Sequence, residues 1–438
     1  MSMFSTEMVS KYHPDKYADQ ISDAVLTAIL KSDPKAHVAC ECLAKGNDVV
    51  LAGEITTTAK VDYEAIVRSV GDSLNYKVDR VINLLTTQSP EIQNAVDSDE
   101  KIGAGDQGMM FGFAVNCGKY YLPYGQETAI DVIKLIEQDI EQNPDSIFLG
   151  DAKTQITTDI DAPSFIKPVD TILISTCHKE GYTLNQVQDY IKALLKRNNI
   201  PEARNLLLNP AGIWTFGGPA ADCGLTGRKI VCDQYGGYAP VGGGAFSGKD
   251  PSKVDRSGCY AARKIAVDMV KKHGFDKCTV QLAYAIGVSE PVSVDAIGML
   301  GKERVDVSSE VKASYDLTPI GINVQPAHLL PQPVVVVACV DHNGRAVLRV
   351  EKDVGDPFPH AGDMLVDPAG IQGLEDLLAP EHQAHDPLLK LRILLRHSLC
   401  LLSPWITTPA ALPAAVCRYR FSWLCIPSDA PVRPGTSA

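Results

Sequence analysis

The amino-acid composition changes near residue 324 and divides the 438 residues into two unequal parts, which constrains where packed domains can lie. The segment 324–438 holds 14 of the 28 prolines and only one of the 15 tyrosines. Lysine is almost absent from it, and its last stretch, PSDAPVRPGTSA, has the composition of a disordered segment. We therefore expect the packed domains to lie before residue 324.

Helical and strand-like patterns both occur before residue 324, without the steady alternation of a parallel α/β fold. Pro14 suits the first position of a helix, and apolar residues at helical spacing follow it as far as Asp33-Pro34. The remaining predicted helices are 62–74, 126–143, 184–199 and 257–274, and the predicted strands include 37–45, 48–59, 109–115, 170–178 and 279–288. These patterns predict an α+β architecture.

Charge and composition exclude several classes of protein. The formal net charge is -12, which argues against nucleic acid as the main partner. No apolar run approaches the ~20 residues that span a bilayer, and the N-terminus has no signal-peptide pattern. The twelve cysteines include no CxxC pair, so we expect reduced thiols, no structural zinc site and a cytoplasmic location.

Two glycine-rich stretches match nucleotide-binding patterns by letter but not by context. Gly103–Gly108 reads GxGxxG, yet polar residues precede it and a strand pattern follows, so it predicts a hinge or tight turn that carries Asp106, not a dinucleotide site. Residues 243–250 resemble a P-loop, but Asp250-Pro251 follows the lysine where a P-loop needs Ser or Thr and a helix.

The second glycine-rich stretch still suits phosphate. Arg228, Lys229, Lys249 and Lys253 lie within 26 residues of one another among glycines, which indicates a polyanion-binding cradle. The alternative for each cation is a solvated surface loop.

His13 stands at the start of the first predicted helix, where free N–H groups favour anions. Asp15 and Asp255 are hard oxygen donors of the kind that Mg²⁺ binds, and together they could bridge one or two ions to a bound polyphosphate. Taken alone, a histidine before a proline is more often a helix cap or a surface residue than a ligand-binding one.

These motifs together resemble one family. HPDK at 13–16, GEITTTA at 53–59, GAGDQGMMFGF at 103–113, DAK at 151–153, GGPAADCGLTGRK at 217–229 and GGGAFSGKDPSKVDRS at 242–257 are similar to S-adenosylmethionine synthetases (methionine adenosyltransferases). The resemblance covers about residues 4–323. It implies synthesis of S-adenosylmethionine from ATP and L-methionine, with cleavage of the tripolyphosphate to phosphate and diphosphate.

The resemblance also implies a fold of three similar α+β domains about a pseudo-threefold axis. We expect domains at 1–100, 101–218 and 219–323, the last one incomplete or altered, followed by an unmatched, partly disordered tail. Two subunits of this family pack through flat sheet faces and share their active sites. A homodimer, or a dimer of dimers, is therefore implied.

The family's site residues carry over by position. Those implied to bind ATP or tripolyphosphate are His13, Lys153, Phe216, Asp222, Arg228, Lys229, Lys249 and Lys253. Of these, His13, Lys153, Arg228, Lys249 and Lys253 are implied to be catalytic, and Phe216 to stack on adenine. Those implied to bind methionine are Glu54, Gln88, Asp106, Asp222 and Lys253. Two Mg²⁺ ions are implied at Asp15 and Asp255 and one K⁺ at Glu41, and 89–104 is implied to be a lid.

The segment after residue 323 departs from the family. A frameshifted or misjoined reading explains this better than a functional extension, and the apolar run 334–340 would either replace part of a lost strand or promote aggregation. The main alternative function is a catalytically inactive, nucleotide-binding or regulatory subunit. A third possible function is that of another ATP-dependent transferase or kinase that uses the same cradle.

Overall fold

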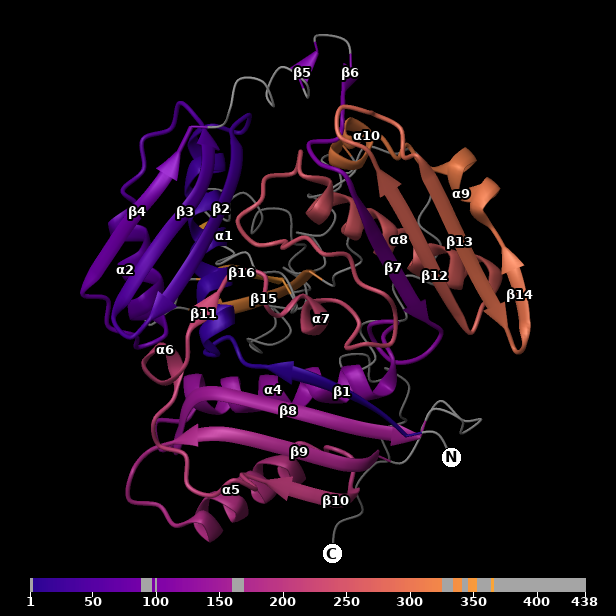
Figure 1. Ribbon diagram of the computed structural model, residues 1–438. Helices are drawn as coiled ribbons and strands as arrows, with labels where there is room; N and C mark the ends of the chain where they lie inside the picture. The colour runs from indigo at the N-terminus through magenta and orange to yellow at the C-terminus, as the bar shows by residue number, and fades with distance from the viewer. Residues whose placement is uncertain are drawn as a thin grey trace, which may run out of the picture. The chain divides into compact units, whose positions relative to one another are not determined.

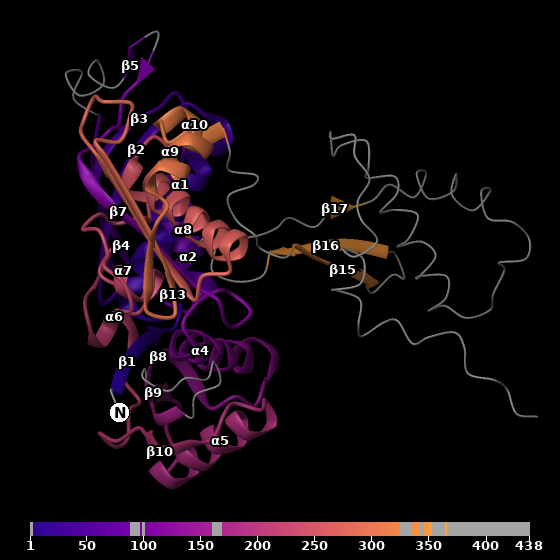
Figure 2. The same cartoon turned by 90° about the vertical axis from the view of Figure 1, so that its right-hand side faces the viewer.

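The structure is a computed structural model that describes residues 3–87, 97–98, 101–159, 169–324, 334–340, 346–352 and 364–365 (Figure 1). The chain divides into two compact units, and the first, which includes residues 1–337, contains three four-stranded sheets. Helices pack on one face of these sheets (Figure 2). The predicted α+β architecture is confirmed.

The first sheet has the strand order β11-β2-β3-β4. Its strands are β2 (His37–Lys45), β3 (Asp48–Thr56), β4 (Arg80–Thr86) and β11 (Gly224–Leu225), and its helices are α1 (Pro14–Ser32) and α2 (Tyr63–Ser73). β3 and β4 run parallel because α2 connects them, and the other neighbours are antiparallel. Even-numbered residues of β2 are buried in the core beside α1, so its odd-numbered residues lie on the sheet's open face.

The second sheet repeats this plan with the order β1-β8-β9-β10. Its strands are β1 (Met3–Val9), β8 (Phe148–Asp159), β9 (Val169–His178) and β10 (Ala203–Leu208), and its helices are α4 (Tyr124–Gln142) and α5 (Leu184–Arg197). β9 and β10 are again the parallel pair, connected by α5.

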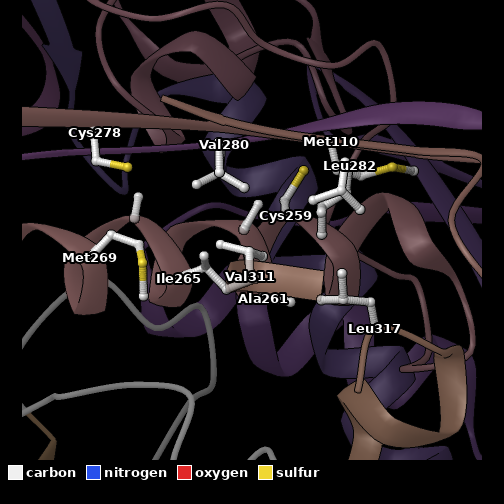
Figure 3. Packing of buried hydrophobic residues seen from close by; sticks show 14 of the residues in the cluster. Met110, Cys259, Ala261, Ile265, Met269, Cys278, Val280, Leu282, Val311 and Leu317 are labelled. Carbon is white, nitrogen blue, oxygen red and sulfur yellow. The ribbon is translucent and has the colours of Figure 1, made fainter. Parts of the chain in front are cut away.

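The third sheet has the order β14-β13-β12-β7 and is antiparallel throughout. Its strands are β7 (Gly108–Val115), β12 (Lys277–Tyr284), β13 (Ser293–Leu300) and β14 (Glu303–Asp306), and its helices are α8 (Val254–His273), α9 (Ser308–Ser314) and α10 (Pro319–Val324). Figure 3 shows Cys259, Ile265 and Met269 of α8 opposite Cys278, Val280 and Leu282 of β12. α8 begins at Val254, three residues before the predicted position, and Val254 is fully buried in this core.

Each sheet receives one edge strand from a distant part of the chain. β1 pairs with β8, β7 with β12, and the two-residue β11 with β2. The segments that follow β1 and β11 lie between the sheets, where α6 (Gly218–Ala221) and α7 (Ile230–Asp233) also lie (Figure 1). The proposed domain boundaries at 100, 218 and 323 stay a prediction.

The later part of the chain contains a short sheet of β15 (Val334–Val340), β16 (Ala346–Lys352) and β17 (Met364–Leu365). The apolar run 334–340 is thus a strand, but it belongs to none of the three four-stranded sheets. The disorder predicted for the end of the chain lies outside the described residues, as does most of the implied lid, of which β5 (Asp97–Ser98) and β6 (Lys101–Ile102) are described. No helix in the described ranges is long and apolar enough to cross a membrane.

Candidate functional site

The first turn of α1 places His13 and Asp15 side by side. His13 is the N-cap, and its Nδ1 accepts a hydrogen bond of 3.1 Å from the Asp15 backbone N–H. Pro14 occupies the first helical position, where no N–H is needed. Because Nδ1 accepts, the proton of the neutral ring is assigned to Nε2, which leaves an N–H donor for a ligand.

The environment of His13 keeps its imidazole neutral. The side chain is buried, and burial is the main reason why its pKa falls to about 4. The positive charges of Lys229 and Lys153 lower the pKa further, against the opposing effect of Asp15. At neutral pH this histidine is therefore a hydrogen-bond donor without a charge.

Asp15 lies at the centre of a cationic group. Its carboxylate is 1% exposed, accepts a hydrogen bond from the Leu225 N–H at 3.0 Å, and contacts Lys229 Nζ at 2.5 Å and Arg228 Nε at 3.6 Å. Burial alone would raise the pKa of Asp15, but the Lys229 ammonium and the Leu225 N–H outweigh it and lower the pKa. The carboxylate is thus ionised.

The two predicted cation-bearing loops are fixed to α1. Gly227 N–H donates to Asp19 Oδ1 at 2.9 Å, and Gly248 N–H donates to Asp23 Oδ1 at 2.9 Å. A Cβ added at Gly227 would lie 2.5 Å from the Ala245 Cβ, so the loops also contact each other. The structure therefore brings the Arg228–Lys229 pair and the glycine-rich stretch together, as the polyanion cradle requires.

The second loop leads into α8. Lys249 Nζ lies 2.5 Å from Asp255 Oδ2, and Lys253 Nζ lies 3.4 Å from Asp250 Oδ2. The predicted absence of a P-loop is confirmed: α8 begins at Val254, five residues after the lysine, and its N-cap is Lys253. A Cβ added at Gly105 would lie 3.5 Å from the Lys253 Cδ, so the segment that carries Asp106 also approaches this loop.

Glu41 and Glu54 share the open face of the first sheet. Both are exposed. Ala39 lies two residues before Glu41 on β2, so the two side chains share a face. Ala39 pairs with Glu54 of β3 on one side and forms an isolated bridge to Lys249 on the other. Residues paired in this way project from the same face. The Glu41 and Glu54 side chains therefore project from the same face as the Lys249 side chain. Gln88 lies outside the described residues.

The other predicted residues lie on or near β8. Lys153 is a half-buried residue of β8, where it pairs with Val9 of β1. Asp222 ends α6 and accepts the Cys223 N–H at 2.8 Å. Phe216 is 66% exposed in the preceding loop.

Three residues outside the predicted set, Asp151, His178 and Trp214, hold the loop that carries Phe216. Asp151 Oδ2 accepts the Gly218 N–H at 2.8 Å, and burial raises the pKa of Asp151 to about 6. The buried His178 accepts the Trp214 N–H at Nε2 (3.3 Å), and Trp214 Nε1 donates to the Phe216 carbonyl at 2.9 Å. Only Asp151 had a signal, since it begins the DAK motif.

Three consecutive segments of the chain match the domains of one known protein family. The N-terminal, central and C-terminal domain models of S-adenosylmethionine synthetase match residues 1–100, 101–214 and 216–352. The chain belongs to the S-adenosylmethionine synthetase family. A similar solved structure is "an Unusual S-adenosylmethionine synthetase from Campylobacter jejuni", with 33% identity and a TM-score of 0.69, over 76% of this chain and 91% of that one.

The comparisons correct one expectation from the sequence. The resemblance does not end at residue 323, since the C-terminal domain of the family matches to residue 352. The motifs quoted for the family all lie before 323, so they gave no sign of this extension. Within the family match, the three segments exchange edge strands in a cycle: β1 joins the sheet of the central segment, β7 that of the C-terminal one, and β11 that of the N-terminal one.

Proposed function

We propose that this chain synthesises S-adenosylmethionine from ATP and L-methionine and then hydrolyses the tripolyphosphate to phosphate and diphosphate. The observation that carries the proposal is the pair of cation-bearing loops fixed to α1 beside a neutral His13. Membership of the family supports the same reaction.

The first step needs alignment and leaving-group stabilisation, not a strong base. The methionine sulfur donates a lone pair to C5′ of the ribose as the C5′–O bond breaks, and the bonding electrons leave with the triphosphate. Arg228, Lys229 and Lys249 would bind the phosphate oxygens, and Lys153 and Lys253 would add positive charge. The resulting sulfonium needs no proton transfer.

His13 fits the point at which charge develops. Its assigned Nε2–H would donate to the oxygen that leaves C5′, and because the ring is neutral it stabilises that oxygen by a hydrogen bond and not by giving up a proton. In the second step the oxygen of a water forms a bond to a terminal phosphorus as the P–O–P bond to the other two phosphates breaks. One water proton stays on the new phosphate, the other passes to the diphosphate or to solvent, and the same cations would hold both products.

The carboxylates suit the implied metal ions. Asp15 and Asp255 each supply hard oxygen donors of the kind that Mg²⁺ binds. Each contacts a lysine ammonium group in the structure, which Mg²⁺ would displace. No group of three or more metal-binding side chains occurs in the described part of the chain, which suits an ion that takes most of its ligands from phosphate and water. Mg²⁺ bound there would neutralise phosphate charge, and Glu41 would bind K⁺.

The substrates and the assembly follow the same reasoning. Glu54 and Asp106 would bind the methionine ammonium group, together with Gln88, and Phe216 would stack on adenine while Asp222 contacts the ribose or methionine. Leu43 on β2 and Leu84 on β4 are exposed, at 37% and 58%, as is Met109 on β7, at 55%. Apolar residues on open sheet faces support a homodimer with shared sites.

The test is an assay of the full chain with ATP, L-methionine, Mg²⁺ and K⁺ that follows all three products together. We expect S-adenosylmethionine, phosphate and diphosphate in equal amounts. His13→Ala should slow their formation by about 10²–10³-fold, as for the loss of one donor to a developing oxyanion. His273→Ala is the matched control, because His273 contacts Glu310 at the end of α8 and no site residue.

The other outcomes separate the alternatives. ATP binding without product would support an inactive nucleotide-binding subunit. ATP turnover that does not require methionine would support another ATP-dependent transferase or kinase.

A further inference from the structure

Lys16 joins two carboxylates beside the predicted cradle. Its Nζ lies 3.0 Å from Asp19 Oδ2 and 2.7 Å from Asp233 Oδ1. The Asp19 side chain is 2% exposed, and those of Lys16 and Asp233 are each 21% exposed. The group is therefore largely shielded from water, where an ion pair holds its geometry better than on an open surface.

This group holds both ends of one short segment. Asp19 Oδ1 accepts the Gly227 N–H at 2.9 Å, and Gly227 directly precedes Arg228. Asp233 is the last residue of α7, and α7 starts directly after Lys229. The Arg228–Lys229 pair therefore lies between two attachment points. The first reaches α1 directly at Asp19, whose other carboxylate oxygen contacts Lys16, and the second reaches α1 through Lys16.

At the start of the same helix, His13 is the N-cap and Asp15 directly precedes Lys16. Lys229 points to Asp15 and takes no part in the Lys16 contacts. The contacts of Lys16 thus fix the backbone of the segment, while its two cations contact Asp15 and stay outside the Lys16 group. An ionic group of this kind pays a desolvation cost that apolar side chains would avoid, so a positional role is the natural hypothesis for it.

We propose that Lys16, Asp19 and Asp233 are positioning residues that set the Arg228–Lys229 pair against the N-terminus of α1. The inference rests on the proposed function for the identity of the anion, a tripolyphosphate. It assigns the three residues no contact with that anion. A shift of the cations by about 1 Å can reduce a rate by about 10²-fold, because leaving-group stabilisation depends on geometry.

The experiment compares Lys16→Met, Lys16→Arg and Asp233→Ala with the wild type. Inorganic tripolyphosphate is the binding probe, measured by calorimetry, and kcat and the KM for methionine are measured on the same samples. Asp189→Ala is the control, because it breaks an exposed lysine–aspartate pair of the same 3.0 Å length on α5.

We expect Lys16→Met and Asp233→Ala to weaken tripolyphosphate binding and to lower kcat, each by about 10-fold or more, with the KM for methionine changed by less than about 2-fold. Lys16→Arg should restore part of both losses, and Asp189→Ala should match the wild type. If Lys16→Met fails to fold, Asp233→Ala carries the test, because its site is partly exposed.

Two results would overturn the inference. Folded Asp233→Ala with wild-type tripolyphosphate affinity and kcat would show that the ion pair has no positional role. A loss in Lys16→Met alone would show that Lys16 binds the anion directly. Failure of the proposed function looks different: the wild type would bind tripolyphosphate, the variants would still differ in affinity, and no S-adenosylmethionine would form.

Discussion

Replacing Arg256 by methionine should destabilise the protein strongly, and by an amount that depends on pH. Arg256 Nη1 lies 2.7 Å from Asp23 Oδ1, and Nη2 lies 3.4 Å from Asp23 Oδ2. The two side chains are 5% and 0% exposed. This bidentate pair joins α8 to α1, and Asp23 also accepts the Gly248 N–H of the glycine-rich loop.

Loss of one partner of a buried pair costs about 3–5 kcal/mol, because the other charge is left buried. At about 2–4 °C per kcal/mol for a large domain, we expect Tm to fall by about 6–20 °C at pH 7.5. Replacing both residues together, as in Asp23→Asn with Arg256→Met, should cost less than the sum of the two single changes.

The pH dependence separates the two single variants. Burial already raises the pKa of Asp23, against the effect of Arg256, and removal of the guanidinium should raise that pKa further. A carboxyl group whose pKa is raised in the folded state makes stability fall as pH rises through the window above the unfolded value. Arg256→Met should therefore regain stability relative to the wild type at pH 5.5. Asp23→Asn should not, because arginine cannot give up its proton.

Thermal unfolding of both variants and the wild type at pH 7.5 and 5.5 checks this reasoning. Arg197→Met is the matched control, since that guanidinium is 54% exposed while it contacts Asp139 at 2.6 Å, and its loss should cost about 1 kcal/mol or less. The reasoning would be refuted if the loss of Tm in Arg256→Met, relative to the wild type, were the same at both pH values. It would also be refuted if that loss were no larger than the loss in Arg197→Met.

Three further predictions concern the site. The His13 ring should stay neutral above about pH 5.5, since its pKa is lowered to about 4, chiefly by burial; NMR titration of the assigned ring checks this, and an inflection near 6.5 would contradict it. The stability that neutral His13 provides should be lost as pH falls from about 6.5 towards 4. Gly244→Ala should lower kcat by about 10-fold or more, because the added Cβ would lie 2.2 Å from the Asp255 Cγ. Gly243→Ala should behave as the wild type in the same assay, because no atom lies within 4 Å of its added Cβ. Chelation of divalent metal should abolish product formation, and added Mg²⁺ should restore it. Asp15→Asn should raise the Mg²⁺ concentration required for half the maximal rate. An unchanged Mg²⁺ concentration at half the maximal rate would argue against Asp15 as a ligand.

Elements with strong local signals were predictable. Pro14 at the first helical position and the run of apolar residues after it predict α1, which the structure places at Pro14–Ser32. Gly274 ends α8 at φ 67, a conformation that glycine adopts without strain. The cation-rich loops and the helix-start histidine were likewise visible, because motif spacing and charge are properties of the chain itself.

Pairings between distant segments were not predictable in the same way. β11 has two residues, too few to show any periodicity, yet it places Arg228 and Lys229 beside α1. Asp19 and Asp233 look like ordinary surface charges in the sequence, and only the approach of α7 to α1 joins them to Lys16 of the HPDK motif.

Local sequence thus determined the helices, most strands, the family and the chemical character of the site, because capping, periodicity and charge act over a few residues. The tertiary structure decided which loops meet, since that depends on which edge strand completes each sheet and buries its apolar face. The neutral state of His13 belongs to the same category: its pKa is set by burial and by a lysine 216 residues further along the chain, which no local pattern encodes.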